Sequence, residues 1–426
     1  MKRRSEFIEH VATLAGGTGF AQLIPLLVAP LLTRLYTPGE YGILSLYVST
    51  CAIISVVSTG RYELAILLPP KYIDADRLTL LSSGLALITG ITTFFIFVIL
   101  IKPISHILFP GFNLNWFYVA PLTIISLGIY QSFSYRLNRD KEYKTIAGSK
   151  IVKNTFTGIG QVGLGFLGIG SWGLIIGKIL GEISASGYLG RKIRTITGKF
   201  STLWSKPDIK KLAKEHLNFP KFNAFHALTT TVSANLPILI LTSFFGTSTA
   251  GLFGLSMRIC YAPVSILAAS IGQVFSRKIS EIHKETGDIT RFTFKTLLSL
   301  TFLGLIPFLI LLIFAPRLFS FVFGQQWKIA GIFSQYLTSW YFLSFLVSPI
   351  MYIPMMLGKQ KKAFIIEMVS FTIRFCALMS GVYYHNEYMS VFAYSLGGSA
   401  ILLYMLLWII KLARNTKTSA LNTQKL

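Results

Sequence analysis

Seven charged side chains lie inside stretches of this sequence that are otherwise apolar, and they are the residues best placed to do chemistry. The stretch VVSTGRYELAILLPP (56–70) contains Arg61 and Glu63; the other five are Lys178, Glu182, Arg258, Glu367 and Arg374. A charge at the centre of a bilayer costs roughly 3 kcal/mol or more, so each needs a partner, a polar cavity or a ligand. Four are positive and three negative, a balance that favours an anionic ligand over a cationic one.

Helical spacing indicates which of these charges can pair. Lys178 and Glu182 are four residues apart, and Glu367 and Arg374 are seven apart, so each pair shares a helix face. For these four residues, structural pairing and a role in a cavity or in ion coupling both stay open. Arg61 and Glu63 are two apart, about 200° around a helix, which predicts a separate partner for each.

The distance of each arginine from the end of its apolar stretch indicates whether it anchors at the membrane surface or lies in a cavity. Arg34 lies at the end of an apolar stretch, where an interfacial anchor is the simpler interpretation. Arg61 and Arg258 lie about eight residues, or about 12 Å, inside theirs, which is too deep for snorkelling alone. The predicted ligand-binding residues are Arg61, Arg258, Arg374, Arg34 and Lys178, and the predicted ion-coupling residues are Glu63, Glu182 and Glu367.

Composition indicates the solvent in which these residues act. The 426 residues are 53% hydrophobic and 13% charged, with a mean hydropathy of +0.61, and apolar runs of about 20 residues recur along the whole chain. We therefore predict an all-α membrane protein. Its twelve predicted spans cover 11–34, 41–68, 78–101, 115–135, 151–170, 172–190, 222–244, 250–276, 296–315, 331–357, 363–384 and 389–410.

The net charge of +24 arises mainly in the breaks between spans, which argues against nucleic-acid binding and for anionic lipid. With twelve spans, 32 of the 40 Lys and Arg residues fall on one side of the membrane and four on the other. The basic side is predicted to be cytoplasmic, with both termini on it. We expect a multi-pass protein of the bacterial cytoplasmic (inner) membrane.

The longest break divides the spans into two sets of six. The predicted organisation is an N-terminal lobe (1–190), a cytoplasmic linker (191–221), a C-terminal lobe (222–413) and a cytoplasmic tail (414–426). Within the linker, a helix opening at Pro207 has apolar residues on one face, namely Trp204, Ile209, Leu212 and Leu217, and is predicted to lie on the lipid surface. TPGEYGILSLY from Thr37 weakly resembles TSTAGLFGLSM from Thr247, with Gly42 matching Gly251, as a duplicated bundle would produce.

Two motifs point to chemistry that their context does not support. GIGQVG (158–163) matches a dinucleotide-binding pattern but lies in a predicted span, so these glycines and those of GLIIGKILG (173–181) are predicted to let helices approach closely. Asp74 and Asp76 resemble metal-binding acids of glycosyltransferases, but helix capping is the simpler role. Because no phosphate-binding loop and no spaced metal ligands occur, we expect no cofactor and no metal.

Several segments resemble one known family. PLLTRLYTPGEYGILSLY, YRLNRDKEYKTIAGSKIVKN, GSWGLIIGKILGE and the long segment from FPKFNAF to FSRKISE are similar to the polysaccharide transporter family, the Wzx-type flippases of the MOP superfamily. The resemblance implies two six-helix lobes around a central cavity. It also implies transport of undecaprenyl-diphosphate-linked oligosaccharide, such as O-antigen (lipopolysaccharide), capsule or exopolysaccharide repeat units, by alternating access. Glycan polymerase and chain-length machinery are the further expected partners.

Two other classes of function remain open. A MATE-like ion-coupled exporter of small molecules would share this architecture, although an exporter of cationic drugs would be expected to have an excess of carboxylates in its spans. A membrane-embedded glycan polymerase would need a large outward loop carrying acids and arginines. The longest outward loops, 102–114 and 316–330, contain no acid. We therefore expect a transporter and not an enzyme.

Overall fold

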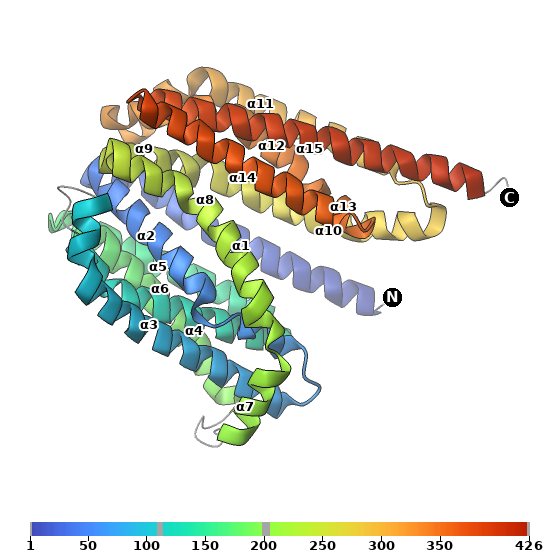
Figure 1. The fold of residues 1–426 in the computed structure, drawn as a ribbon, viewed down its shortest axis with the longest axis horizontal. Helices are drawn as coiled ribbons and strands as arrows, with labels where there is room; N and C mark the ends of the chain where they lie inside the picture. Colours follow the sequence, from blue (N-terminus) through green and yellow to red (C-terminus); the bar gives the residue numbers. More distant parts are fainter. Residues whose placement is uncertain (1, 109–113, 198–204, 424–426) are drawn as a thin grey trace. The chain divides into compact units, whose positions relative to one another are not determined.

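The computed structural model describes residues 2–108, 114–197 and 205–423, and all regular elements among them are helical (Figure 1). The first unit of the chain contains α1 (Lys2–Leu35), α2 (Pro38–Ser58), η1 (Tyr62–Leu67), α3 (Tyr72–Leu108), η2 (Asn115–Val119), α4 (Ala120–Arg139), α5 (Tyr143–Phe166), α6 (Ser171–Thr197), α7 (Lys206–Glu215), η4 (Phe219–Asn223) and α8 (Ala224–Phe245). These are followed by α9 (Thr247–Ser256), η5 (Met257–Tyr261), α10 (Ala262–Thr286), α11 (Thr290–Phe323), η6 (Gln325–Trp327), α12 (Lys328–Ile350), α13 (Tyr352–Met356), α14 (Gln360–Tyr383) and α15 (Glu387–Thr423).

The predicted all-α membrane fold is confirmed, since each predicted span overlaps one helix or a run of consecutive helical pieces. Among the described residues, eight stretches are long and apolar enough to cross a membrane, and the segment Gly19–Leu35 of α1 is a shorter apolar helix. The helices α4, α5 and α6 do not meet that standard. These three helices contain the buried ion pairs of Arg136 and Glu182 that are described below.

The second predicted span differs from the structure in one respect that matters for function. The helix α2 ends at Ser58, ten residues before the predicted end at 68. Gly60 and Arg61 both have φ of 60°, in the left-handed region, and the chain then continues as the 3₁₀ helix η1. A left-handed residue ends an α-helix, because it turns the backbone away from the helix axis.

The chain divides into two compact units, Met1–Gly251 and Leu252–Leu426. The first unit includes α8, which packs against α2, so this boundary lies beyond the predicted start of the C-terminal lobe at 222. The predicted lobes and linker stay a prediction. In the second unit, α12 packs against α10, α11 and α15, with Phe333, Leu337 and Tyr341 fully buried.

The glycines of α6 allow close packing against α5, as predicted (Figure 1). A Cβ atom on Gly181 would lie 1.9 Å from Thr157 Oγ1 and 2.6 Å from the Lys153 carbonyl oxygen, and one on Gly177 would lie 2.5 Å from the Gln161 nitrogen. Real Cβ atoms do not approach so closely, so only glycine permits this separation of the helices.

The two segments of the weak internal repeat meet within the first unit. A Cβ atom on Gly42 would lie 1.7 Å from the Thr247 carbonyl oxygen, and one on Gly251 would lie 1.9 Å from the Pro38 carbonyl oxygen. The matched glycines therefore serve the same purpose in both segments, which is backbone-to-backbone contact between the starts of α2 and α9.

The predicted linker helix exists as α7, but its position partly differs from the prediction. Leu212 is buried in a cluster with Tyr62, Ile66 and Leu78, Asp208 pairs with Arg77 at 2.8 Å, and the Tyr62 hydroxyl donates to the Ala213 carbonyl. Part of the apolar face therefore packs on protein and not on lipid. Leu217 is 51% exposed, and Trp204 lies outside the described residues.

The predicted topology can be checked by labelling. In a variant without Cys51, Cys260 and Cys376, a cysteine at Lys361 is expected to react with a membrane-impermeant maleimide only in inverted vesicles. Cysteines at Gln325 and Asn386 are expected to react only in intact cells, since positive loops stay cytoplasmic. All three native residues are exposed, so access to the side chain does not limit the reaction. Labelling of the Lys361 position in intact cells would contradict the twelve-span topology.

Candidate functional site in the first unit

A buried carboxylate lies between two lysines where α5 packs against α6. Glu182 in α6 has a side chain only 1% exposed, and its two oxygens lie 2.7 Å from Lys153 Nζ and 2.8 Å from Lys178 Nζ. Lys178 is one helical turn away, as its spacing predicted, whereas Lys153 comes from α5. We call these three residues the lysine triad; its net charge is +1.

The close packing of α5 and α6 is what assembles the lysine triad. Gly181 precedes Glu182 and faces the Lys153 backbone, so the short interhelical distance carries the Glu182 carboxylate to the Lys153 ammonium. Lys153 lies ten residues into α5, about 15 Å from its start, and Glu182 lies eleven residues into α6, about 16 Å from its start. The lysine triad therefore lies deep within both helices.

The lysine triad can still attract an anion, because its lysines are not fully enclosed. Lys153 is 22% exposed and Lys178 is 23% exposed, whereas the carboxylate between them is not accessible. The Tyr130 ring lies 5.5 Å from Lys153 Nζ, and its hydroxyl is 3.1 Å from Ser149 Oγ. Two ammonium groups on one carboxylate leave an excess positive charge, which attracts a phosphate group.

Lys153 was not among the predicted site residues. The predicted fifth span (151–170) places it only two residues from the basic loop, whereas α5 begins at Tyr143 and places it ten residues from the start of the helix. The signal that could have found it is the spacing of Lys150, Lys153 and Thr157 along one side of a helix.

Arg61 and Glu63 form an ion pair, which corrects the prediction that each has a separate partner. Arg61 Nη1 lies 3.3 Å from Glu63 Oε1, and the Thr59 hydroxyl donates to the other Glu63 oxygen. The 200° separation assumed a continuous helix, but the left-handed turn at Gly60 and Arg61 brings the two side chains together. Glu63 is fully buried, while Arg61 is 22% exposed.

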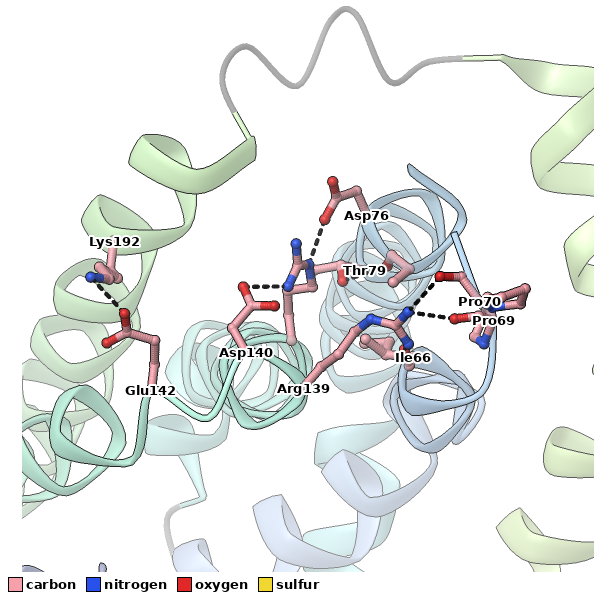
Figure 2. Close-up of polar contacts among 11 residues, drawn as sticks. Ile66, Pro69, Pro70, Asp76, Thr79, Arg139, Asp140, Glu142 and Lys192 are labelled. Carbon is pink, nitrogen blue, oxygen red and sulfur yellow. Dashed lines mark hydrogen bonds and ion pairs between the residues drawn. The ribbon is translucent and has the colours of Figure 1, made fainter. Parts of the chain in front are cut away.

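A second buried network lies at the end of α4, and we call it the arginine clamp: Arg136 and Arg139 with the groups that they bind. Arg136, only 1% exposed, lies 2.5 Å from Asp76 Oδ1 and 2.6 Å from Asp140 Oδ2. Figure 2 shows Asp76 in α3 and Asp140 at the end of α4 converging on this point. The predicted capping role suits Asp74, in the first turn of α3, but Asp76 instead joins α3 to α4.

Arg139 holds the segment that follows η1. Its guanidinium donates to the carbonyl oxygen of Ile66 and to those of Pro69 and Pro70, and Figure 2 shows the two proline contacts. Two prolines in a row have no amide hydrogen to donate, so their backbone is fixed here through its acceptors. The arginine clamp therefore immobilises the chain next to the Arg61–Glu63 pair.

One further ion pair joins the α4–α5 turn to α6 (Figure 2). Lys192 Nζ lies 2.9 Å from Glu142 Oε1, and its hydrogen bond holds the pKa of Glu142 below its usual range. Both side chains are about one-third exposed, so the pair is charged at neutral pH and contributes little to stability. Variants of this exposed pair can therefore be compared with variants of the buried lysine triad.

The remaining predicted residues are distributed as follows. Glu367 and Arg374 pair at 3.3 Å in α14, which is one of the two roles that the sequence left open for them, with Glu367 half exposed. Arg258 lies in the π-helical turn η5 and is partly buried, and Arg34 is exposed in the last turn of α1. Within the described ranges, neither of these two makes an ion pair, and no group of three potential metal ligands occurs.

The fold resembles solved transporters of the MOP superfamily. The inward closed conformation of the lipid II flippase MurJ aligns with a TM-score of 0.72 and 14% identity, covering 96% of this chain and 90% of that one. An inward-facing multidrug resistance MATE family transporter aligns with a TM-score of 0.69 and 14% identity, covering 93% and 96%. A MOP superfamily transporter from Pyrococcus furiosus aligns with a TM-score of 0.63 and 12% identity, covering 96% of each chain.

No curated protein matches the chain significantly in sequence. A family model does match, over residues 31–331, and its description is polysaccharide biosynthesis protein. The match covers well over half of the 426 residues. The resemblance found in the sequence is thereby confirmed: the chain belongs to this family of polysaccharide biosynthesis proteins and has the fold of the MOP superfamily.

Proposed function

We propose that this protein is a flippase that moves an undecaprenyl-diphosphate-linked oligosaccharide across the bacterial cytoplasmic membrane by alternating access. The lysine triad is the observation that carries the proposal. A diphosphate cannot cross hydrocarbon unaided, and a deep site with two ammonium groups and one carboxylate supplies the compensating charge. Membership of a polysaccharide biosynthesis family supports a glycan as the cargo.

The triad also argues against the export of cationic drugs, which the shared MATE-like fold would otherwise favour. A bulky organic cation would need an accessible carboxylate at this site, but Glu182 is enclosed and its charge is already more than balanced by the two lysines. An anionic head group, by contrast, meets the exposed parts of Lys153 and Lys178. The carboxylates Glu63, Glu182 and Glu367 stay candidates for coupling to an ion gradient, as predicted from the sequence.

The proposal predicts that Lys153→Gln and Lys178→Gln each reduce glycan export about tenfold or more, because losing one charge-assisted contact to phosphate costs about 2 kcal/mol. The undecaprenyl-linked oligosaccharide should accumulate, as measured by mass spectrometry of extracted lipids. Each variant retains one lysine beside Glu182, so the amount of folded protein should stay within about twofold.

Lys192→Gln is the matched control, because it removes an exposed lysine from the same helix as Lys178 and should leave export unchanged. Export at the normal rate by well-expressed Lys153→Gln and Lys178→Gln variants would remove the triad from the transport path. A deletion strain with normal levels of lipid-linked intermediates would reject the flippase function itself.

A further inference from the structure

An apolar cleft lies in the second unit, between α10 and α11, and none of the charged groups described so far lines it. Its volume is about 410 Å³, and it is lined by Ser270, Ile271, Val274, Phe275, Phe292 and Thr296. The two hydroxyl groups are not available to a ligand as free donors. Ser270 donates to the Ile266 carbonyl at 2.9 Å and Thr296 to the Phe292 carbonyl at 3.0 Å, so both bond within their own helices.

Two aromatic rings line one part of the cleft and determine the shape of the ligand that it can bind. Phe275 and Phe292, from opposite sides, stack with ring centroids 5.5 Å apart and planes 14° apart. Phe275 is 2% exposed, whereas Val274 at the rim is 67% exposed. A ligand therefore meets hydrocarbon and flat ring faces, which favours an apolar chain with flat unsaturated units.

Basic side chains flank this cleft at the end of α11 that the predicted topology places in the cytoplasmic leaflet. Arg291 and Lys295 immediately precede Phe292 and Thr296, and both are exposed. Among the described residues neither makes an ion pair, whereas Arg277 and Lys278 of α10 share Glu281. Phe292 and Thr296 lie about 3 and 9 Å from the start of α11, so the cleft opens near the depth of lipid head groups.

We propose that this cleft binds the prenyl chain of a lipid-linked diphosphate on entry from the cytoplasmic leaflet, with the diphosphate beside Arg291 and Lys295 before it reaches the lysine triad. The inference rests on the proposed flippase function and adds to it a place where the substrate's tail is held. A prenyl chain has a flat double bond in each unit, which suits the Phe275 and Phe292 rings better than a saturated acyl chain does. A diphosphate also carries more charge than a phosphodiester and so matches these two cations, for which the described residues supply no ion-pair partner.

The test uses the full-length protein in lipid nanodiscs and a benzophenone-bearing prenyl diphosphate. Photolabelling followed by mass spectrometry is expected to give adducts within residues 270–275 and 292–296. Val274→Trp places a large ring at an exposed rim and should lower labelling about tenfold without disturbing the core. Leu303→Trp, at a position of α11 that is 60% exposed, is the matched control and should label normally.

Competition experiments distinguish a prenyl diphosphate from an ordinary anionic phospholipid as the ligand of the cleft. Unlabelled prenyl diphosphate should suppress labelling, and phosphatidylglycerol at the same mole fraction should not. Arg291→Gln combined with Lys295→Gln should weaken labelling about tenfold, because the head group loses both cations. Equal competition by phosphatidylglycerol, or labelling unchanged by Val274→Trp, would overturn the proposal.

Failure of this inference is distinguishable from failure of the flippase function. Unchanged labelling in Val274→Trp, together with lost export in Lys153→Gln, would reject only the cleft. Normal lipid-linked intermediates in the deletion strain would reject flipping, whatever the labelling shows. Thr296→Phe fills the same cleft from α11, and it should lower labelling as Val274→Trp does if the latter variant proves poorly folded.

Discussion

Glu182→Ala is expected to lower the free energy of unfolding by about 3–5 kcal/mol, because it leaves the ammonium groups of Lys153 and Lys178 facing each other without a counter-charge. Steric trapping in bicelles would measure this loss, and the amount of folded protein in cells should fall accordingly. Glu367→Ala is the matched control. Its carboxylate is 50% exposed and has one described ion-pair partner, so we expect a loss below about 1 kcal/mol.

A triple variant separates the structural role of the lysine triad from its proposed role in transport. In Lys153→Met, Lys178→Met and Glu182→Leu combined, apolar groups of similar size replace all three charges. Such replacement of buried ion pairs is often neutral or stabilising, so at least half of the stability lost in Glu182→Ala should return. Export should stay absent, because no cation remains to meet a diphosphate. A triple variant that is stable and exports normally would show that the triad only holds α5 against α6.

Arg136→Met is expected to have a comparable effect, about 3–5 kcal/mol, at the arginine clamp. It leaves the Asp76 and Asp140 carboxylates close together in a poorly solvated site, since their side chains are 11% and 15% exposed. Thermal unfolding in detergent would report the loss. Hydrogen exchange should also rise at Ile66, because α3 and α4 frame the segment that Arg139 holds.

The control for the arginine clamp is Lys192→Met, which breaks the exposed pair with Glu142 and should cost less than about 1 kcal/mol. Adding Asp76→Asn and Asp140→Asn to Arg136→Met removes the carboxylate repulsion, so most of the stability should return. If Arg136→Met unfolds at the wild-type temperature, the network is dispensable and α3 and α4 are held by apolar packing alone.

Much of the fold could be predicted because bilayer solvation acts on local sequence. A span needs about 20 apolar residues wherever it lies in the fold, so the spans could be placed along the chain without knowing their neighbours. Helical spacing is equally local: it placed Lys178 and Glu182 on one helix face, and Glu367 and Arg374 on another. Pairing was one of the two roles left open for these residues, and the structure shows both pairs. The close approach of α5 and α6 was likewise predicted from glycine spacing.

Contacts across helices were not accessible from the sequence, because they depend on which faces meet. Lys153 joins Glu182 from another helix, and Arg136 joins Asp76 across 60 positions. The burial of Leu212 likewise requires η1 and α3, which supply its partners Tyr62, Ile66 and Leu78, to be in place.

The Arg61–Glu63 pair is the clearest example of a contact that the sequence alone did not predict. The residue types and their apolar surroundings identified two charges that need compensation, whatever the fold. Only the structure decided that they compensate each other, because a left-handed turn at Gly60 and Arg61 replaces the expected helix and redirects both side chains. Hydropathy and helical period are properties of short stretches and can be read from sequence. The end of a helix inside an apolar run depends on tertiary contacts, here the Arg139 guanidinium on the Ile66 and Pro69 carbonyls, which hold the next segment in place.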